Sequence, residues 1–218
     1  MLRKETISDE LSQYLDSLMT ITPLKNHRLV GGTALSLQLG HRKSIDIDLF
    51  SDQKSDYPEI LKNLQLIFKS NIKQYRTSET GIEMVIGNVK IDIHDWTPKF
   101  IRPELLIGNW RLAIKEDIIA MKFQAICDTY TARYEKKDFV DVAALMNEFS
   151  LEQMMHFYNE KYPDNKLSER IILERLALIS RAENKEMPLM LNGQDWTATK
   201  KIIASAIDSY VKNKLLGD

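Results

Sequence analysis

The chain has 218 residues, of which 44% are hydrophobic and 28% are charged, and its formal net charge is −1. This length and composition predict a soluble, folded protein that can bury a real core, with room for two compact parts. The near-neutral charge gives no global sign of nucleic-acid binding, and the single cysteine, Cys127, indicates neither a disulfide framework nor a structural zinc site.

The N-terminal segment interleaves charged residues with leucines and predicts a helix from Ser8 to Met19. It lacks the apolar run of a secretory signal, and no stretch of the sequence is apolar for long enough to cross a bilayer. We therefore expect a cytoplasmic protein without a membrane partner.

Two glycines stand out next. A short apolar strand around Leu29 precedes Gly31 and Gly32, and residues typical of a helix follow from Thr33 to Leu39, ending at Gly40. Glycines let a backbone approach a ligand closely, and the first amides of a helix, with the Thr33 hydroxyl, suit phosphate oxygens. The segment matches neither a Walker loop nor the dinucleotide-binding glycine pattern. It therefore predicts a phosphate-binding turn of another kind.

The strand that follows carries two aspartates. Period-2 alternation puts Ile45, Ile47 and Leu49 on one side of it and Asp46 and Asp48 on the other. Both carboxylates can then reach the same metal ion, and neighbouring like charges cost energy unless a cation neutralises them. The alternative is an ordinary solvated face of a half-buried strand.

A third aspartate lies further along the chain. The sequence predicts a helix and then three strands, at Tyr57 to Lys69, 72–76, 82–86 and 89–94. The last two strands meet at Gly87-Asn88, a pair suited to a two-residue hairpin turn. Asp92 alternates with isoleucines, so it points away from the apolar side. Three strand carboxylates suit Mg²⁺ and can serve two metal ions, whereas an outward-facing strand residue is the alternative for Asp92.

The second half of the chain reads as helical. From residue 96 to residue 114 the pattern is irregular, and helices are predicted at 115–128, 136–148, 151–160, 168–181 and 197–215. A sheet therefore dominates only the first half, which predicts an α+β fold followed by a helical C-terminal half. The two parts are expected at 1–100 and 101–218.

Lys122 lies within or beside the apolar stripe of the first of these helices. Such a lysine either covers the core with its stem while its ammonium reaches solvent, or aims the ammonium into a cleft at phosphate oxygens. Arg133 admits the same two interpretations. Asp138 and Asp141 can simply favour an early helical turn through the helix dipole.

These residues carry a resemblance to the polymerase-β-type nucleotidyltransferases and, more narrowly, to the AbiEii/AbiGii family of abortive-infection toxins. The matching segments are Gly31–Leu35, Arg42–Phe50, Asp117–Ala125, Arg133 and Lys137–Val142. The resemblance implies that residues 1–100 form a nucleotidyltransferase-like catalytic core, a mixed sheet with flanking helices. It further implies that residues 101–218 form a helical region that completes the active-site cleft.

The resemblance also implies roles for individual residues. It makes Asp46, Asp48 and Asp92 catalytic metal ligands and Lys122 a catalytic contact to the triphosphate. It implies nucleotide binding by a wider set of residues, namely Gly31, Gly32, Thr33, Ser44, Lys122, Arg133, Asp138 and Asp141. The implied cofactor is Mg²⁺ or Mn²⁺, and the implied substrate is an NTP.

The implied reaction moves a nucleoside monophosphate from the NTP to a hydroxyl acceptor, either an RNA such as tRNA or a protein. The implied setting is phage defence or a toxin–antitoxin pair, with a cognate antitoxin as partner. Two other classes stay open. One is a catalytically weak nucleotide-binding or protein-interaction module of the same fold, and the other is an RNA-binding protein with a single basic face.

Overall fold

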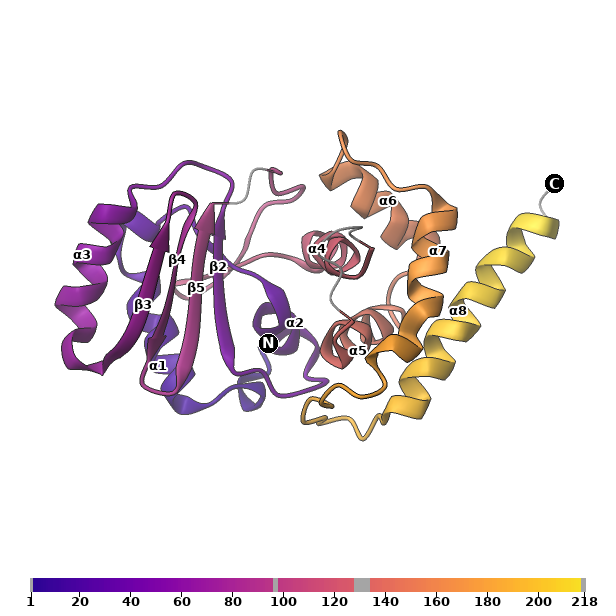
Figure 1. The fold of residues 1–218 in the computed structure, drawn as a ribbon, viewed down its shortest axis with the longest axis horizontal. Helices are drawn as coiled ribbons and strands as arrows, with labels where there is room; N and C mark the ends of the chain where they lie inside the picture. Colours follow the sequence, from indigo (N-terminus) through magenta and orange to yellow (C-terminus); the bar gives the residue numbers. More distant parts are fainter. Residues whose placement is uncertain (1, 96–97, 128–133, 217–218) are drawn as a thin grey trace. The chain divides into compact units, whose positions relative to one another are not determined.

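The chain forms a sheet with covering helices in its first half and a set of helices in its second half (Figure 1). A computed structural model describes residues 2–95, 98–127 and 134–216. The chain divides into two compact units, Met1–Ile114 and Lys115–Asp218. Each unit is described by itself below.

The first unit is built on a mixed sheet, which in the described residues has seven strands in the order β3-β4-β5-β2-β1-β7-β6. In chain order the strands are β1 (Arg28–Leu29), β2 (Asp46–Ser51), β3 (Ile72–Ser78), β4 (Gly81–Ile86), β5 (Val89–Asp95), β6 (Leu105–Ile107) and β7 (Trp110–Leu112). Strand β2 pairs with β5 in parallel, as β1 does with β7, and the other pairs are antiparallel.

The segment from 101 to 114 differs from its predicted form. The sequence predicts no regular structure there, yet β6 and β7 form and β7 pairs with β1. Strands of three residues are too short to show a convincing alternation. Because these strands extend the sheet, the boundary between the units follows Ile114 instead of lying near residue 100.

The helices that accompany the sheet are α1 (Asp9–Met19), α2 (Gly31–Leu39) and α3 (Tyr57–Phe68). The predicted start of α1 is confirmed, because the Ser8 side chain accepts a hydrogen bond from the Leu11 amide at 3.1 Å. Single 3₁₀ turns at Lys4–Thr6, Thr22–Leu24 and Lys69–Asn71 complete the helical elements described in this unit. The rings of Tyr14 in α1 and Phe68 in α3 meet edge to face, 5.6 Å apart.

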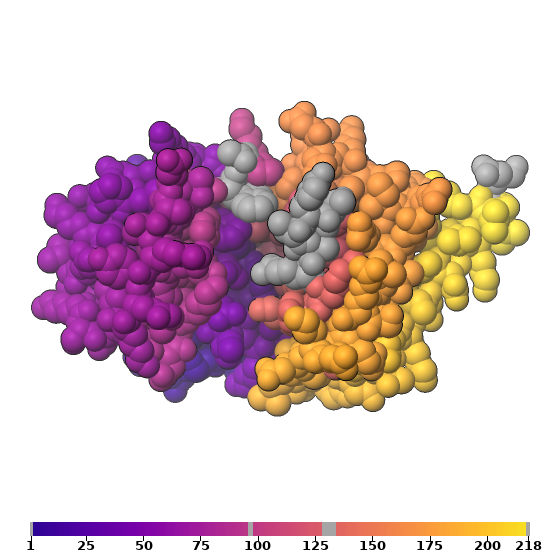
Figure 2. Space-filling view, in the orientation of Figure 1, coloured from indigo at the N-terminus to yellow at the C-terminus, as the bar shows by residue number. Residues whose placement is uncertain are grey.

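Alternation along the strands separates an apolar face from a polar one. In β5 the isoleucines Ile91 and Ile93 are fully buried, and in β2 Ile47 and Leu49 are buried in the same way. The placement of Ile45 on this apolar face is wrong: its side chain is 73% exposed, because β2 begins one residue later. Strand β3 is exposed over most of its length and contributes to the surface seen in Figure 2.

The second unit is helical, as predicted. Its helices are α4 (Lys115–Cys127), α5 (Lys136–Leu145), α6 (Leu151–Lys161), α7 (Glu169–Ala177) and α8 (Trp196–Leu216), with a 3₁₀ segment at Leu178–Ala182. A fully buried ion pair ties α6 to α4, with Lys161 Nζ 2.8 Å from Asp117 Oδ1. Cys127 is a free, buried thiol, and burial raises its pKa to about 12, which keeps it protonated and unreactive. The α+β architecture is confirmed.

Within the described ranges, no helix combines the length and the apolar character that crossing a bilayer requires.

Arg111 in β7 provides the first prediction, because its guanidinium binds three backbone carbonyls of the first unit. It donates to the carbonyl oxygens of Met19, Leu24 and His27 at 3.0–3.2 Å. Arg111→Met keeps much of the side-chain volume but leaves these acceptors without their donors. We expect the free energy of unfolding to fall by about 2–3 kcal/mol in chemical denaturation.

The matched control is Arg76→Met. Arg76 is 77% exposed and forms a surface ion pair with Glu83, so its loss should cost about 0–1 kcal/mol. Equal stability of the two variants would show that the Arg111 contacts do not hold β7 to the segment from 19 to 27.

Candidate functional site

The register between β2 and β5 brings charged residues together on the polar face of the sheet. Asp48 lies directly opposite Asp92, and Asp46 lies directly opposite Lys90. Neighbouring strands are about 4.8 Å apart, and residues two apart on one strand point to the same side. The four side chains therefore mark the corners of one patch, three acidic and one basic. We call these residues the carboxylate patch.

Lys90 is the cation of this patch. Its Nζ lies 2.5 Å from Asp92 Oδ2, and the two side chains are 52% and 18% exposed. Partial burial, the largest single effect, lowers the pKa of Lys90. The hydrogen bond to Asp92 and the negative charges of all three aspartates together raise that pKa above the ordinary lysine value. An exposed pair of this kind contributes only about 0–1 kcal/mol.

The start of α2 lies beside the patch. Gly31 has a left-handed backbone, with φ of 65°, and a Cβ at this position would overlap Asp48 Oδ2. A Cβ at Gly32 would overlap Nη2 of Arg42, a residue that is only 3% exposed. A side chain at Gly31 would be strained by this backbone and would displace the Asp48 carboxylate, and one at Gly32 would displace the Arg42 guanidinium. The two glycines lie inside the first turn of α2, which begins two residues earlier than predicted.

Thr33 and Ser44 form a buried polar contact next to this turn. The Thr33 hydroxyl shares a 2.8 Å hydrogen bond with the Ser44 hydroxyl and donates to the backbone carbonyl of Asp46. These contacts fasten α2 to the start of β2. The binding of a nucleotide by these two residues stays a prediction.

The donor chemistry of the patch suits a divalent ion. Carboxylate oxygens are the hard ligands that Mg²⁺ and Mn²⁺ prefer. Asp92 Oδ1 is buried and has no hydrogen-bond partner among the described residues, which leaves an acceptor facing no donor. In the part of the chain that the structure describes, however, no three His, Cys, Asp or Glu side chains already converge as a metal cluster.

In the second unit, the structure brings Lys122 together with Asp138 and Asp141. Lys122 Nζ lies 2.7 Å from Asp138 Oδ1 and 2.6 Å from Asp141 Oδ2. The lysine side chain is 9% exposed, and those of the aspartates are 2% and 0% exposed. The snorkelling alternative for Lys122 is therefore wrong, because its ammonium is buried with two carboxylates. Arg133 lies outside the described residues.

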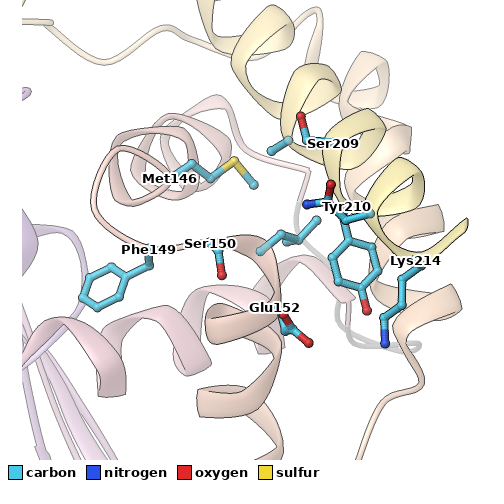
Figure 3. Close-up of a pocket in the computed structure, with 10 residues that line it drawn as sticks. Met146, Phe149, Ser150, Glu152, Ser209, Tyr210 and Lys214 are labelled. Carbon is cyan, nitrogen blue, oxygen red and sulfur yellow. The ribbon is translucent and has the colours of Figure 1, made fainter. Parts of the chain in front are cut away.

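The second unit also contains a cavity of about 410 Å³ between the first turn of α6 and the C-terminal part of α8 (Figure 3). Its lining consists of Met146, Phe149, Ser150, Leu151, Glu152, Ala206, Ser209, Tyr210, Asn213 and Lys214. In Figure 3, Tyr210 and Lys214 of α8 lie on one side of the cavity, and Met146 and Ser150 lie on the other. None of these residues belongs to the set predicted from the sequence.

Two residues of the first site escaped sequence reasoning. Lys90 could have been found, because it shares the alternation of Asp92 and therefore its face of β5. Arg42 begins a segment that carries the family resemblance but was given no role, because it stands outside any periodic segment and its contact with Gly32 arises only in the fold.

Comparisons with known proteins point in one direction. A family model described as "Nucleotidyl transferase AbiEii toxin, Type IV TA system" matches residues 13–212. An uncharacterized protein from Aquifex aeolicus (strain VF5) is 25% identical over 184 residues, covering 82% of this chain and 86% of that protein.

Two solved structures share the fold. JHP933 from Helicobacter pylori superimposes with a TM-score of 0.54 and 17% identity, over 96% of this chain and 99% of its own. An antigenic nucleotidyltransferase-like protein from Paracoccidioides brasiliensis gives a TM-score of 0.50 and 17% identity, over 92% of this chain and 93% of its own.

The contact between Gly31 and Asp48 can be measured. Gly31→Ala forces a side chain into a left-handed backbone and against Asp48, so we expect a loss of about 2–4 kcal/mol in the free energy of unfolding. Gly193→Ala is the control, because Gly193 has φ of 74° and nothing lies within 4 Å of its Cβ position. That variant should lose only the backbone term, about 1–2 kcal/mol. Equal losses would contradict a close approach of Asp48 to α2.

The Lys122 cluster gives a second stability prediction. Lys122→Met leaves two buried carboxylates without their cation, which should lower the free energy of unfolding by about 3–5 kcal/mol in denaturant titrations. Lys115→Met, which removes a lysine of the same helix from a more exposed pair with Glu148, should cost about 0–1 kcal/mol. If both variants were as stable as the parent, the buried cluster would have no structural role.

Proposed function

The chain belongs to the AbiEii family of nucleotidyl transferase toxins of type IV toxin–antitoxin systems, and we propose that it transfers a nucleoside monophosphate from an NTP to a hydroxyl acceptor with the help of a divalent metal ion. One observation carries this proposal. Asp46, Asp48 and Asp92 share one face of two neighbouring parallel strands, beside the first turn of α2.

We assign the three aspartates to metal binding. Their carboxylates supply hard oxygen ligands, and the unpartnered Oδ1 of Asp92 is available as one of them. When bound, a divalent ion would lower the pKa of the attacking hydroxyl and offset charge on the leaving pyrophosphate. The role of the protein is to hold these ligands on a rigid sheet, so that little reorganisation accompanies the reaction.

We assign phosphate binding to the start of α2. The first amides of a helix have no intrahelical partners, and the helix dipole favours negative charge there. The side chain of Val30, at the N-cap, makes no hydrogen bond to this helix. Arg42 adds a guanidinium against Gly32, and this group suits phosphate oxygens. Thr33 and Ser44 stabilise this turn through their buried hydrogen bond.

We assign Lys122, Asp138 and Asp141 to nucleotide binding on the ground of the family resemblance. Within the second unit, two buried carboxylates fix the position of the Lys122 ammonium. Arg133 belongs to the same proposal on the ground of the family resemblance alone. For the acceptor we propose an RNA such as tRNA or a protein, and for the partner a cognate antitoxin that restrains the toxin.

The test is incubation of the protein with each labelled NTP, Mg²⁺ or Mn²⁺, and total cellular RNA and protein. We expect label on one acceptor class, and we expect Asp48→Asn to reduce labelling by about 10³-fold or more, since metal electrostatics supply several kcal/mol. Asp208→Asn, an exposed site in α8, should label normally.

Circular dichroism should show the same fold for both aspartate variants. Near-normal labelling by Asp48→Asn would overturn the metal assignment. Binding of an NTP without any labelled product would instead identify a nucleotide-binding module with little catalysis.

A further inference from the structure

The carboxylate patch holds four positions and only one of them is basic. Lys90 stands opposite Asp46 in the register and bonds Asp92 on its own strand. With the lysine charged, the patch keeps two formal negative charges. The lysine side chain is half exposed, and its long stem can turn away from Asp92 without disturbing the sheet.

We propose that Lys90 is a built-in counter-ion of the carboxylate patch, which competes with divalent metal for Asp92 and so weakens the binding of free metal ions. This inference depends on the metal-binding role of the three aspartates proposed above. Lys90 does not serve as a ligand itself, because a protonated amine has no lone pair to offer a metal.

Two features of the contacts support competition. First, Lys90 binds Oδ2 of Asp92, whereas Oδ1 has no hydrogen-bond partner among the described residues. One oxygen of this carboxylate is therefore left for a metal ion. Second, the pair is exposed enough to be screened and exchanged, unlike the buried lysine pairs of the second unit. A divalent ion with twice the charge can therefore take over Asp92 while the ammonium moves into solvent.

The experiment measures metal binding without nucleotide or turnover. Mn²⁺ binding is followed by electron paramagnetic resonance for the wild-type protein, Lys90→Met, Lys90→Arg, Asp48→Asn and the control Lys62→Met, which removes an exposed lysine from α3. We expect Lys90→Met to bind Mn²⁺ about tenfold more tightly than wild type, because one opposing charge has gone. Lys90→Arg keeps the charge and should resemble wild type, as should Lys62→Met.

Thermal unfolding separates this role from a merely structural one. In chelator, Lys90→Met should melt below wild type, because the patch has lost the positive charge of Lys90, and Mn²⁺ should close that gap. A variant that unfolds in chelator and refolds with Mn²⁺ supports the proposal equally. A melting deficit that persists at saturating Mn²⁺ would overturn it.

The remaining outcomes are distinct. If Asp48→Asn loses Mn²⁺ binding while Lys90→Met binds as wild type does, or more weakly, the counter-ion role is overturned and the metal site stands. If neither wild type nor Lys90→Met binds Mn²⁺, the metal assignment of the proposed function fails, and the role of Lys90 fails with it.

Discussion

The parallel pairing of β2 with β5 is the constraint on which the candidate site depends. It sets Asp48 beside Asp92 and Asp46 beside Lys90, and it does so through backbone hydrogen bonds that are indifferent to the side chains they align. A slip of β5 by one residue would turn Lys90 and Asp92 toward the buried face. The isoleucines and leucine on that face therefore hold the charged residues in register, because their burial is lost if the register changes.

Local patterns in the sequence contained much of this arrangement. Alternation in β5 and in β2 from Asp46 onward assigned each aspartate to the polar side, and helix patterns located the elements of the second unit. The hairpin turn at Gly87-Asn88 followed from its residue types, and Ile86 indeed pairs with Val89 across it. These features depend on neighbours a few residues apart, which is why the sequence alone could predict them.

Other features depend on partners far along the chain. Alternation assigns a side chain to a face but says nothing of which strand lies beside it. The resemblance implied that Asp92 joins Asp46 and Asp48 as a metal ligand, but the pairing of Asp48 with Asp92 came only from the fold. The partners of Lys122 come from a different helix, and the packing that buries all three side chains decided between the alternatives for it. The glycines illustrate a subtler limit: their residue types indicated close approach, but the approaching groups, Asp48 and Arg42, are set by the tertiary fold.

The chain uses the same chemical pair, a lysine and an aspartate, for two different purposes, and burial separates them. Lys122 and its two carboxylates are almost fully removed from solvent, so losing one member would strand charge in the interior. Lys90 is 52% exposed, so little free energy is lost when its bond to Asp92 breaks, because water then hydrates the ammonium. A permanent cation suits a rigid helical unit, whereas an exchangeable one suits a surface that must accept a metal ion. The degree of burial, more than the residue types, therefore decides which lysine holds its unit together and which can give way to a ligand.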